Sequence, residues 1–419
     1  MRDAKRRRTG LQMQKTIHVQ QLRPGMFVLR LHGSWLKHPF WRKSFVVDAD
    51  DVALLQHSHV EHVDIDARRG HDVAGADNDS PAQAVDDAQR AAARPAAAES
   101  ASTARMEWVG FAAEVARARR ICAEGRDVVE SMFREARMGR ALDVDAAVPL
   151  AMEISASVMR HPGALVSVAR LKTADDYTYL HSVAVSALMV ALARELGLPE
   201  EARREAAMGG LLHDLGKARM PLAILNKPGR LSDDEFRIVR THPAEGEQLL
   251  RESGVENRAV LHMVRHHHER MDGAGYPDAL DQEGIPLLTR MSAVCDVYDA
   301  VTSNRPYKPG WDPAESLRRM ASWQGHFDTD VFKALVRSLG IYPIGSLVRL
   351  SSERLAVVIE QGAHTLAQPK VRVFYSIKSR SHVLNHDIDL AASGCTERIT
   401  DVESPSKWGF RRLENLWLG

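Results

Sequence analysis

Histidines and acids recur along one part of this sequence at spacings that suit a shared metal site. The stretch HHHERMDGAGYP, from His266 to Pro277, places three histidines and an acid before a turn rich in Gly and Asp. A second stretch, GGLLHDLGK, sets His213 next to Asp214. Imidazole and carboxylate groups without a thiolate suit iron, manganese, nickel or zinc. These stretches favour a metal centre built from several segments of the chain.

Taken singly, most of the candidate ligands have a plainer structural explanation. His181, on a strongly apolar segment, suits a hydrogen-bonded core histidine. His242 precedes Pro243 and suits the start of a helix. Asp296 is harder to explain, because a carboxylate inside an apolar helix is unfavourable unless it is paired or binds a metal. Only the joint pattern of these residues favours the metal site.

The composition indicates an ordinary soluble protein of more than one domain. The chain has 419 residues, which is long for one hydrophobic core, and its formal net charge of +1 gives no reason to expect a nucleic-acid polymer as partner. Its three cysteines share no metal-like spacing, which suits a reducing compartment. No apolar run approaches the roughly 18 residues of a membrane span, and no signal peptide is evident. We therefore expect a cytoplasmic protein of bacterial type with no membrane span.

The N-terminal part predicts a small β-rich module, residues 12–66, followed by a linker. The segment TIHVQQLRPGMFVLRL alternates apolar and polar residues around a Pro-Gly turn. Trp35, Phe40 and Trp41 form an aromatic cluster that we interpret as the core of the module, although a ligand pocket is the alternative. Residues 67–105 are rich in Ala, Asp and Ser and have almost no large apolar side chain, so we expect a flexible linker there.

The remainder of the chain predicts a helical domain over 106–341 and a short β-rich extension over 342–419. Apolar residues recur at helical spacing through the first of these, whereas IGSLVRLSSERLAVVIEQ and PKVRVFYSIKS alternate as strands do. The fold class is therefore mainly α, with a β-rich module at each end. After a first helix that starts near residue 106, we expect helices at 146–160, 163–173, 176–196, 200–215, 233–252, 256–267, 287–303 and 313–321.

Several motifs together resemble one known family. The order H…HD…H…HH…D, with HDLGK at its second station, resembles the HD superfamily of metal-dependent phosphohydrolases. HHHERMDGAGYP narrows the resemblance to the HD-GYP family of bacterial cyclic-di-GMP phosphodiesterases, and NKPGRLSDDEF, THPAEG and IPLLTRMSAVCDVYDAVTSNRPYK agree with it. The resemblance covers about residues 150–340 and implies an all-α HD-type bundle. QLRPGMFV and WLKHPFW are similar to an uncharacterised module that often precedes such domains.

The resemblance implies a set of metal ligands that hold two divalent ions, with iron or manganese favoured and nickel or zinc allowed. Asp214 would bridge the two ions. Tyr177 occupies the place where some members carry an extra acid for a third metal, so we expect two. His266 falls outside the family's ligand pair, and we expect a plain surface histidine there. The implied ligands are His181, His213, Asp214, His242, His267, His268 and Asp296.

Other residues would act on the substrate or support the ligands. The resemblance implies a catalytic part for Asp214 and Lys217, with Lys217 on the scissile phosphate. We expect Glu269, Arg270 and Asp299 to hold the outer ring nitrogens of ligand histidines. The loop around Tyr276 would approach the substrate, although a purely structural loop is the alternative. The implied substrate-binding residues are Lys217, Arg305, Lys308, Gly275, Tyr276 and Pro277.

The implied activity is hydrolysis of cyclic-di-GMP to pGpG by a hydroxide that bridges the two metals. Whether a second cut gives GMP stays open. Two alternatives also stay open: a cyclic-dinucleotide sensor or interaction module with little turnover, and an HD hydrolase of another cyclic dinucleotide. A GGDEF-type diguanylate cyclase is the candidate protein partner, and a homodimer is the candidate assembly.

Overall fold

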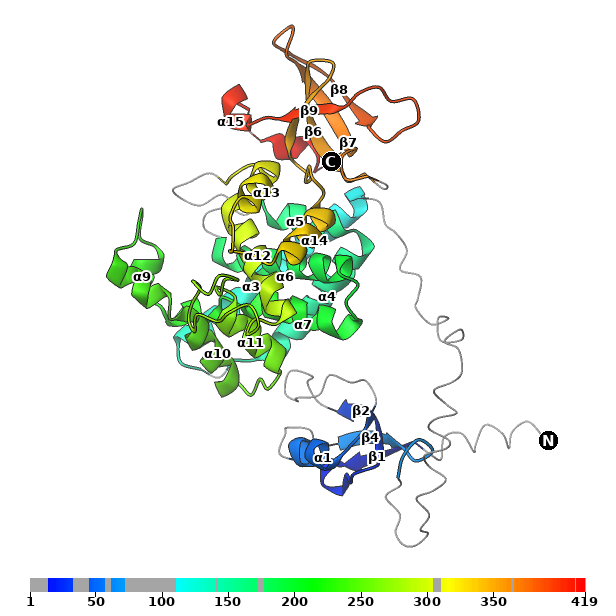
Figure 1. Cartoon of the computed structure of the whole chain (residues 1–419), viewed down its shortest axis with the longest axis vertical. Helices are drawn as coiled ribbons and strands as arrows, with labels where there is room; N and C mark the ends of the chain where they lie inside the picture. Colours follow the sequence, from blue (N-terminus) through cyan, green and yellow to red (C-terminus); the bar gives the residue numbers. More distant parts are fainter. Residues whose placement is uncertain are drawn as a thin grey trace, which may run out of the picture. The chain divides into compact units, whose positions relative to one another are not determined.

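The chain forms two compact units, Met1–Glu107 and Trp108–Gly419, each described here by itself. The computed structural model describes residues 14–32, 45–56, 62–71, 111–140, 142–171, 177–303, 310–362, 365–410 and 412–418 (Figure 1). The predicted aromatic cluster and the predicted linker from residue 72 onward lie outside these ranges. The predicted boundary between 341 and 342 stays a prediction, since both sides of it belong to the second unit.

The first unit contains the small N-terminal sheet that the sequence predicts. Its four strands form an antiparallel sheet in the order β1-β4-β2-β3, so β4 lies between the two strands that come first in the chain. The side chains of Ile17, Val28 and Ile65 lie in its core. The elements are β1 (Gln14–His18), η1 (Val19–Gln21), β2 (Phe27–His32), β3 (Phe45–Val46), α1 (Ala49–Gln56) and β4 (His62–Asp66).

Helices make up the first part of the second unit, as predicted. The predicted helix 233–252 is in fact two helices, because Pro243 lacks an N–H and its ring cannot follow a continuing helix. The elements are α3 (Phe111–Arg137), η3 (Val144–Ala146), α4 (Ala147–Arg160), α5 (Pro162–Ala169), α6 (Tyr177–Glu195), α7 (Glu200–Leu212), η4 (Leu215–Arg219), α8 (Leu222–Leu225), α9 (Asp233–Val239), α10 (His242–Glu252), α11 (Arg258–His266), α12 (Leu287–Thr302), α13 (Pro313–Ala321) and α14 (Thr329–Leu339).

Helix α6 is the centre of this bundle. Residues 181–193 are all buried, which matches a helix that is apolar on every side. It packs against α3, α4, α5, α7, α12 and α14, and it lies among them in Figure 1. His181 lies near the N-terminal end of this helix and is 2% exposed. The helix therefore fixes one candidate ligand in the interior.

A five-stranded antiparallel sheet follows the helices, in the order β8-β7-β6-β5-β9. Both faces of its central strands are covered by apolar side chains, so the predicted β-rich extension has a core of its own. None of the helices in the described ranges is long and apolar enough to cross a membrane. The elements are β5 (Leu347–Leu350), β6 (Arg354–Glu360), β7 (Lys370–Ser376), β8 (Ser381–Asp389), β9 (Ile399–Val402), α15 (Pro405–Trp408) and η5 (Leu413–Leu416).

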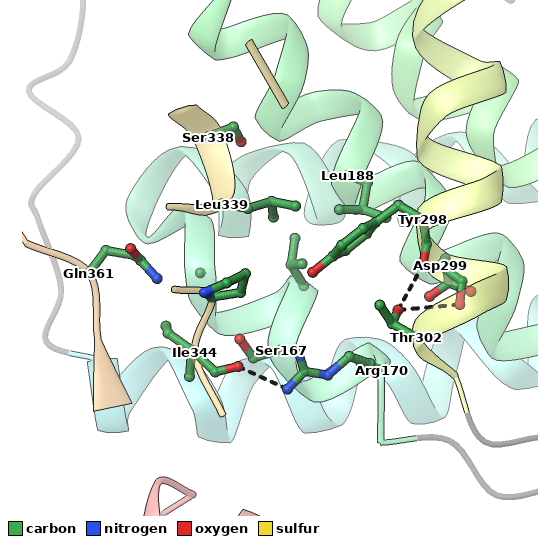
Figure 2. A pocket seen from close by; sticks show the side chains of 13 residues that line it. Ser167, Arg170, Leu188, Tyr298, Asp299, Thr302, Ser338, Leu339, Ile344 and Gln361 are labelled. Atoms are coloured by element: carbon green, nitrogen blue, oxygen red, sulfur yellow. Dashed lines mark hydrogen bonds between the residues drawn. The ribbon is translucent and has the colours of Figure 1, made fainter. Parts of the chain in front are cut away.

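The sheet is anchored on the helices through a small polar junction. Arg170, just after α5, donates a 2.9 Å hydrogen bond to the Ile344 carbonyl (Figure 2). A cavity of about 20 Å³ lies beside this bond, and Tyr298 and Asp299 of α12 also line it. Such a volume holds about one water molecule. The C-terminal extension thus packs close to the helix that carries Asp296.

A buried acid joins helices α7 and α11. Glu205 is 1% exposed, and its Oε1 accepts a 2.9 Å hydrogen bond from Asn257 Nδ2. Asn257 Oδ1 in turn accepts from two backbone N–H groups at the start of α11. Burial raises the pKa of Glu205 to about 7, although the Asn257 bond acts in the opposite direction. A carboxyl group whose pKa is higher in the folded state stabilises the fold at low pH, and this contribution is lost as pH rises through 7.

The free energy of unfolding should therefore respond to pH through this residue. Relative to Glu205→Gln, the wild type should lose stability as pH rises from 4.5 to 7, by at most about 1.4 kcal/mol per pH unit. Urea unfolding at several pH values measures this difference. Glu124→Gln, which removes an exposed acid from helix α3, is the control and should give a flat difference. A flat difference for Glu205→Gln would contradict the prediction.

Candidate metal centre

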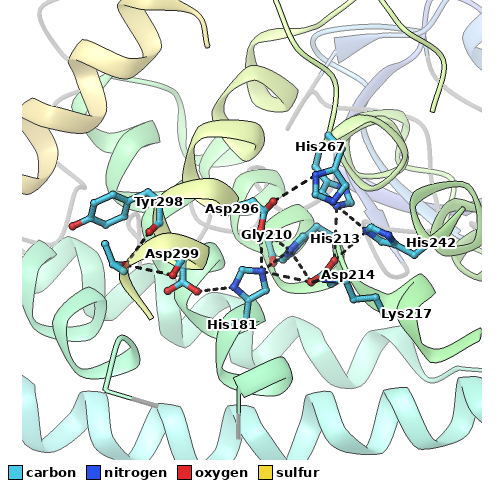
Figure 3. A network of polar contacts seen from close by, with 12 residues as sticks. His181, Gly210, His213, Asp214, Lys217, His242, His267, Asp296, Tyr298 and Asp299 are labelled. Carbon is cyan, nitrogen blue, oxygen red and sulfur yellow. Dashed lines mark hydrogen bonds and ion pairs between the residues drawn. The ribbon is translucent and has the colours of Figure 1, made fainter. Parts of the chain in front are cut away.

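The structure brings together all seven of the predicted metal ligands. Figure 3 labels six of them. They come from five parts of the bundle: α6, the end of α7, the start of α10, the end of α11, and α12. Six of them are between 1% and 7% exposed, and His268 is partly exposed. Residues distant in sequence thus meet at one buried point.

Asp214 lies between two groups of histidines. Its Oδ2 atom is 3.5 Å from His181 Nε2 and 3.4 Å from His213 Nε2. Its Oδ1 atom is 3.3 Å from His242 Nε2 and 3.8 Å from His267 Nε2. Each carboxylate oxygen therefore faces a different pair of imidazoles.

The two remaining candidates complete these groups. Asp296 Oδ1 is 3.0 Å from His181 Nε2, in the first group. Its Oδ2 atom is 3.7 Å from His268 Nδ1, in the second group. His181, His213 and Asp296 can offer ligand atoms within 4.8 Å of one another, and so can His242, His267 and His268. The arrangement provides two adjoining sets of donors.

The backbone fixes which nitrogen each imidazole turns toward the centre. Three of the histidines use Nδ1 to donate to the carbonyl three residues earlier, at 2.7 to 2.9 Å. A neutral imidazole that donates from Nδ1 carries a lone pair on Nε2. The lone pairs of these rings therefore point inward. The bonded pairs are His213 with Gly210, His242 with Val239, and His267 with Val264.

These inward-facing acceptors fit a bound cation. The Nε2 atoms of His181 and His213 are 3.3 Å apart, and those of His242 and His267 are 3.2 Å apart. Asp214 Oδ1 is buried and accepts no hydrogen bond. Buried acceptors that face one another are unfavourable unless positive charge lies among them. The donor set, imidazole and carboxylate, suits a divalent transition metal.

The charge states of three of the candidate ligands also suit metal binding, which requires deprotonated groups. Burial acts to raise the pKa of Asp214, but Lys217 and His213 hold it well below the usual range. Asp296 is also buried, yet its bond to His181 lowers its pKa. Burial lowers the pKa of His268 to about 3, against the attraction of Asp296. Both carboxyl groups are thus charged and His268 is neutral at neutral pH.

Lys217 lies at the edge of the centre, on the tight 3-10 helix η4. Its Nζ atom contacts Asp214 Oδ2, and its side chain is 25% exposed. Gly216, next to it, lets η4 pack directly on α10: a Cβ atom there would lie 1.9 Å from the His242 carbonyl oxygen. This close packing fixes Lys217 between Asp214 and solvent.

Comparison with known proteins identifies the family. A family model described as "HD domain" matches residues 153–331. A cyclic di-GMP phosphodiesterase of Pseudomonas aeruginosa is 50% identical over 409 residues, which are 97% of this chain and 96% of that protein. The chain belongs to the HD-GYP family. A second family model, "Domain of unknown function (DUF3391)", matches residues 14–147, which include α3.

Two more distant relatives match a smaller part of the chain. The cyclic di-GMP phosphodiesterase response regulator RpfG of Xanthomonas campestris is 43% identical over 150 residues, 35% of this chain and 39% of that protein. The 3'3'-cGAMP-specific phosphodiesterase 1 of Vibrio cholerae is 35% identical over 165 residues, 39% of this chain and 38% of that protein. Relatives of this chain are thus named for more than one cyclic dinucleotide.

The loop of residues 272–277, which carries the Gly-Tyr-Pro motif and is called the HD-GYP loop here, packs directly against the candidate metal centre. The Tyr276 ring stacks on the His268 ring, with 4.6 Å between centroids and 28° between planes. The peptide bond from Tyr276 to Pro277 is cis. Gly275 is buried, and a Cβ atom there would lie 2.4 Å from Glu269 Cα, so only glycine lets the loop pass this closely. The loop thereby places Tyr276 over a candidate ligand.

The partners that we predicted for the outer ring nitrogens differ from those observed, apart from Asp299. Asp299 Oδ2 is 2.6 Å from His181 Nδ1. Glu269 instead accepts from the backbone N–H groups of Asp278 and Leu280, which follow the loop. Arg270 forms an ion pair with Asp272. Backbone carbonyls, not the side chains of Glu269 and Arg270, accept from the outer ring nitrogens of three histidines. Because every residue has a carbonyl group, the sequence cannot identify these acceptors.

His266 corrects our expectation of a surface histidine. It is 7% exposed, and its Nε2 atom is 2.8 Å from Asp278 Oδ2. Asp278 also pairs with Arg265 at 2.7 Å. His266 and Arg265 therefore hold the segment after the loop, through an acid that lies 12 residues further along the chain than His266. The side chains of Tyr177, Arg305 and Lys308 lie outside the described residues.

Loss of the Asp299 carboxylate should weaken metal binding without removing a ligand. A carboxylate on the outer nitrogen orients the imidazole and raises its basicity, and removing such a group weakens metal affinity by about 10- to 100-fold. We expect this loss for Asp299→Ala in competition titrations against a chromophoric chelator. Asp330→Ala is the control, since that side chain is 90% exposed. Equal affinity of both variants would contradict the positioning role of Asp299.

Proposed function

We propose that this chain is a cyclic-di-GMP phosphodiesterase whose active site is the centre around Asp214. The observation that carries the proposal is one buried carboxylate with each oxygen facing a separate pair of inward-turned histidines. The relative from Pseudomonas aeruginosa, similar along nearly the whole chain, is named for this activity. We propose pGpG as the first product, and a second cut of the same kind would give GMP.

The two donor sets would hold two divalent ions, iron or manganese in our proposal, with nickel or zinc as alternatives. His181, His213 and Asp296 would hold one ion, and the three histidines at 242, 267 and 268 the other. Asp214, which lies between the two donor sets, would help to hold both ions. Bound ions of this kind supply Lewis acidity toward a phosphate oxygen and a water.

The chain's own residues would orient the phosphodiester and balance its charge. Lys217 reaches from the Asp214 carboxylate toward solvent, so its ammonium group can donate to a phosphate oxygen that enters the centre. Tyr276 covers His268 and can contact the substrate at the entrance. We also propose phosphate contacts for Arg305 and Lys308, which rest on the resemblance of SNRPYK to the family.

A second candidate substrate comes from the relatives. Proteins of Vibrio cholerae named as 3'3'-cGAMP-specific phosphodiesterases share about a third of the matched residues, so another cyclic dinucleotide is the main alternative. A sensor with little turnover is the other alternative. From the family resemblance we further propose a cytoplasmic location, a GGDEF-type diguanylate cyclase as partner, and a homodimer.

Replacement of Asp214 tests the proposed function directly. The wild type, purified without oxygen, should contain about two metal ions per chain and hydrolyse cyclic-di-GMP. Asp214→Ala should lose metal and lower turnover by at least about 100-fold. Metal analysis and chromatography of the products measure both quantities, with Asp330→Ala as the control. A wild type with two metals and no turnover would contradict the enzyme and favour the sensor.

A further inference from the structure

Helix α9 carries two apolar side chains that the core does not cover. None of its residues is buried, and Phe236 and Ile238 are 47% and 40% exposed. The helix is held by a capping box between Ser232 and Glu235 and by Lys227, whose Nζ is 2.6 Å from Glu235 Oε2. Single exposed apolar residues are common on protein surfaces. The neighbours of Phe236 are what distinguish it from Ile238.

Phe236 belongs to a patch that reaches the metal centre. Its ring lies 6.5 Å from the Tyr276 ring, at 75° to it. The guanidinium carbon of Arg240 lies 4.6 Å from the Tyr276 centroid and 5.9 Å from the Phe236 centroid. Tyr276 in turn stacks on His268. We call these three residues, Phe236, Arg240 and Tyr276, the aromatic-arginine patch.

The position of α9 fixes this patch beside the site. Phe236 and Arg240 are four residues apart, so they lie on the same side of the helix. Arg240 ends α9 only two residues before His242, which begins α10. The ring of His242 is also 5.1 Å from that of His268. The patch is therefore joined to the candidate ligands both along the chain and through Tyr276.

Arg240 also differs from the arginines around it. Arg237 pairs with Asp234, and Arg219 pairs with Glu245. Within the described part of the chain, no carboxylate pairs with Arg240, which is exposed. Its N–H groups are thus available to a ligand that enters next to Tyr276.

We propose that Phe236 and Arg240, beside Tyr276, form the subsite that binds one guanine base of the cyclic dinucleotide, a proposal that rests on the function proposed above. A flat base gains affinity by stacking on an exposed aromatic ring. The O6 and N7 atoms of guanine accept the two parallel N–H groups of a guanidinium. Adenine presents an amino group in place of O6, so Arg240 selects guanine and Phe236 strengthens binding of either base.

Phe236→Ala, Arg240→Met and Ile238→Ala in the full chain test the subsite. Ile238→Ala is the matched control, because it removes an exposed apolar side chain from the same helix. The first readout is the ratio of kcat/KM for cyclic-di-GMP to kcat/KM for bis(p-nitrophenyl) phosphate, a phosphodiester without a base. We expect this ratio to fall about tenfold in Phe236→Ala and in Arg240→Met, within the range for one stacked base or one bidentate contact.

The second readout is the dissociation constant, which does not depend on turnover. Calorimetry with phosphorothioate analogues of cyclic-di-GMP and cyclic-di-AMP should show about tenfold weaker binding of both by Phe236→Ala. Arg240→Met should weaken binding of the guanine compound about tenfold more than binding of the adenine compound, which lowers the preference for guanine about tenfold. Phe236→Trp should retain the affinity of the wild type, since it keeps an aromatic face.

The outcomes separate this subsite from the proposed function. Turnover by the wild type together with ratios and dissociation constants equal to those of Ile238→Ala would overturn the subsite alone. No turnover, but weaker binding by Phe236→Ala and a lost guanine preference in Arg240→Met, would support the subsite and overturn the enzyme. A wild type that neither binds nor hydrolyses cyclic-di-GMP would overturn both.

Discussion

The charge of one buried carboxylate, Asp214, is the constraint on which the centre of this protein depends. The group is 1% exposed and one of its oxygens accepts no hydrogen bond. An isolated buried charge of this kind is strongly unfavourable. Lys217 compensates part of it at one oxygen, and the remaining acceptors face other acceptors. A bound cation at this point would interact with these buried carboxylate and imidazole acceptors.

The architecture of the bundle follows from the need to bring these groups together. Helix α6 fixes His181, and the break between α7 and η4 turns Asp214 toward both groups of histidines. The carbonyl three residues before each of three histidines sets its ring so that Nε2 points inward. Carbonyl groups at helix ends have no helical partner, so they can accept from Nδ1 of these rings. This bond orients each ring and brings the Nε2 atoms close together at the centre.

The sequence predicts which residues gather at the candidate centre, because a metal site needs particular chemical types. It predicts fold class for a similar reason, since the period of the apolar residues differs between helices and strands. It could not indicate the acceptors behind the histidines, because any residue supplies a carbonyl. His266 shows a second limit: its partner Asp278 becomes adjacent only when the loop folds back. The contact between Phe236 and Tyr276 could not be predicted either, because the two residues lie in segments far apart in the sequence. The spacing of apolar residues within each segment does not indicate that the segments meet.

The order of strands in the N-terminal sheet has a consequence for how that module forms. Strand β4 pairs with both β1 and β2, although it follows them and α1 in the chain. Strands β1 and β2 therefore do not pair with each other as a hairpin before β4 is available. Pairing of distant segments is slow, since loop closure precedes any gain from contacts. On a ribosome, β1 and the β4-facing edge of β2 stay unpaired until residue 66 has emerged, so the module is completed late and all at once.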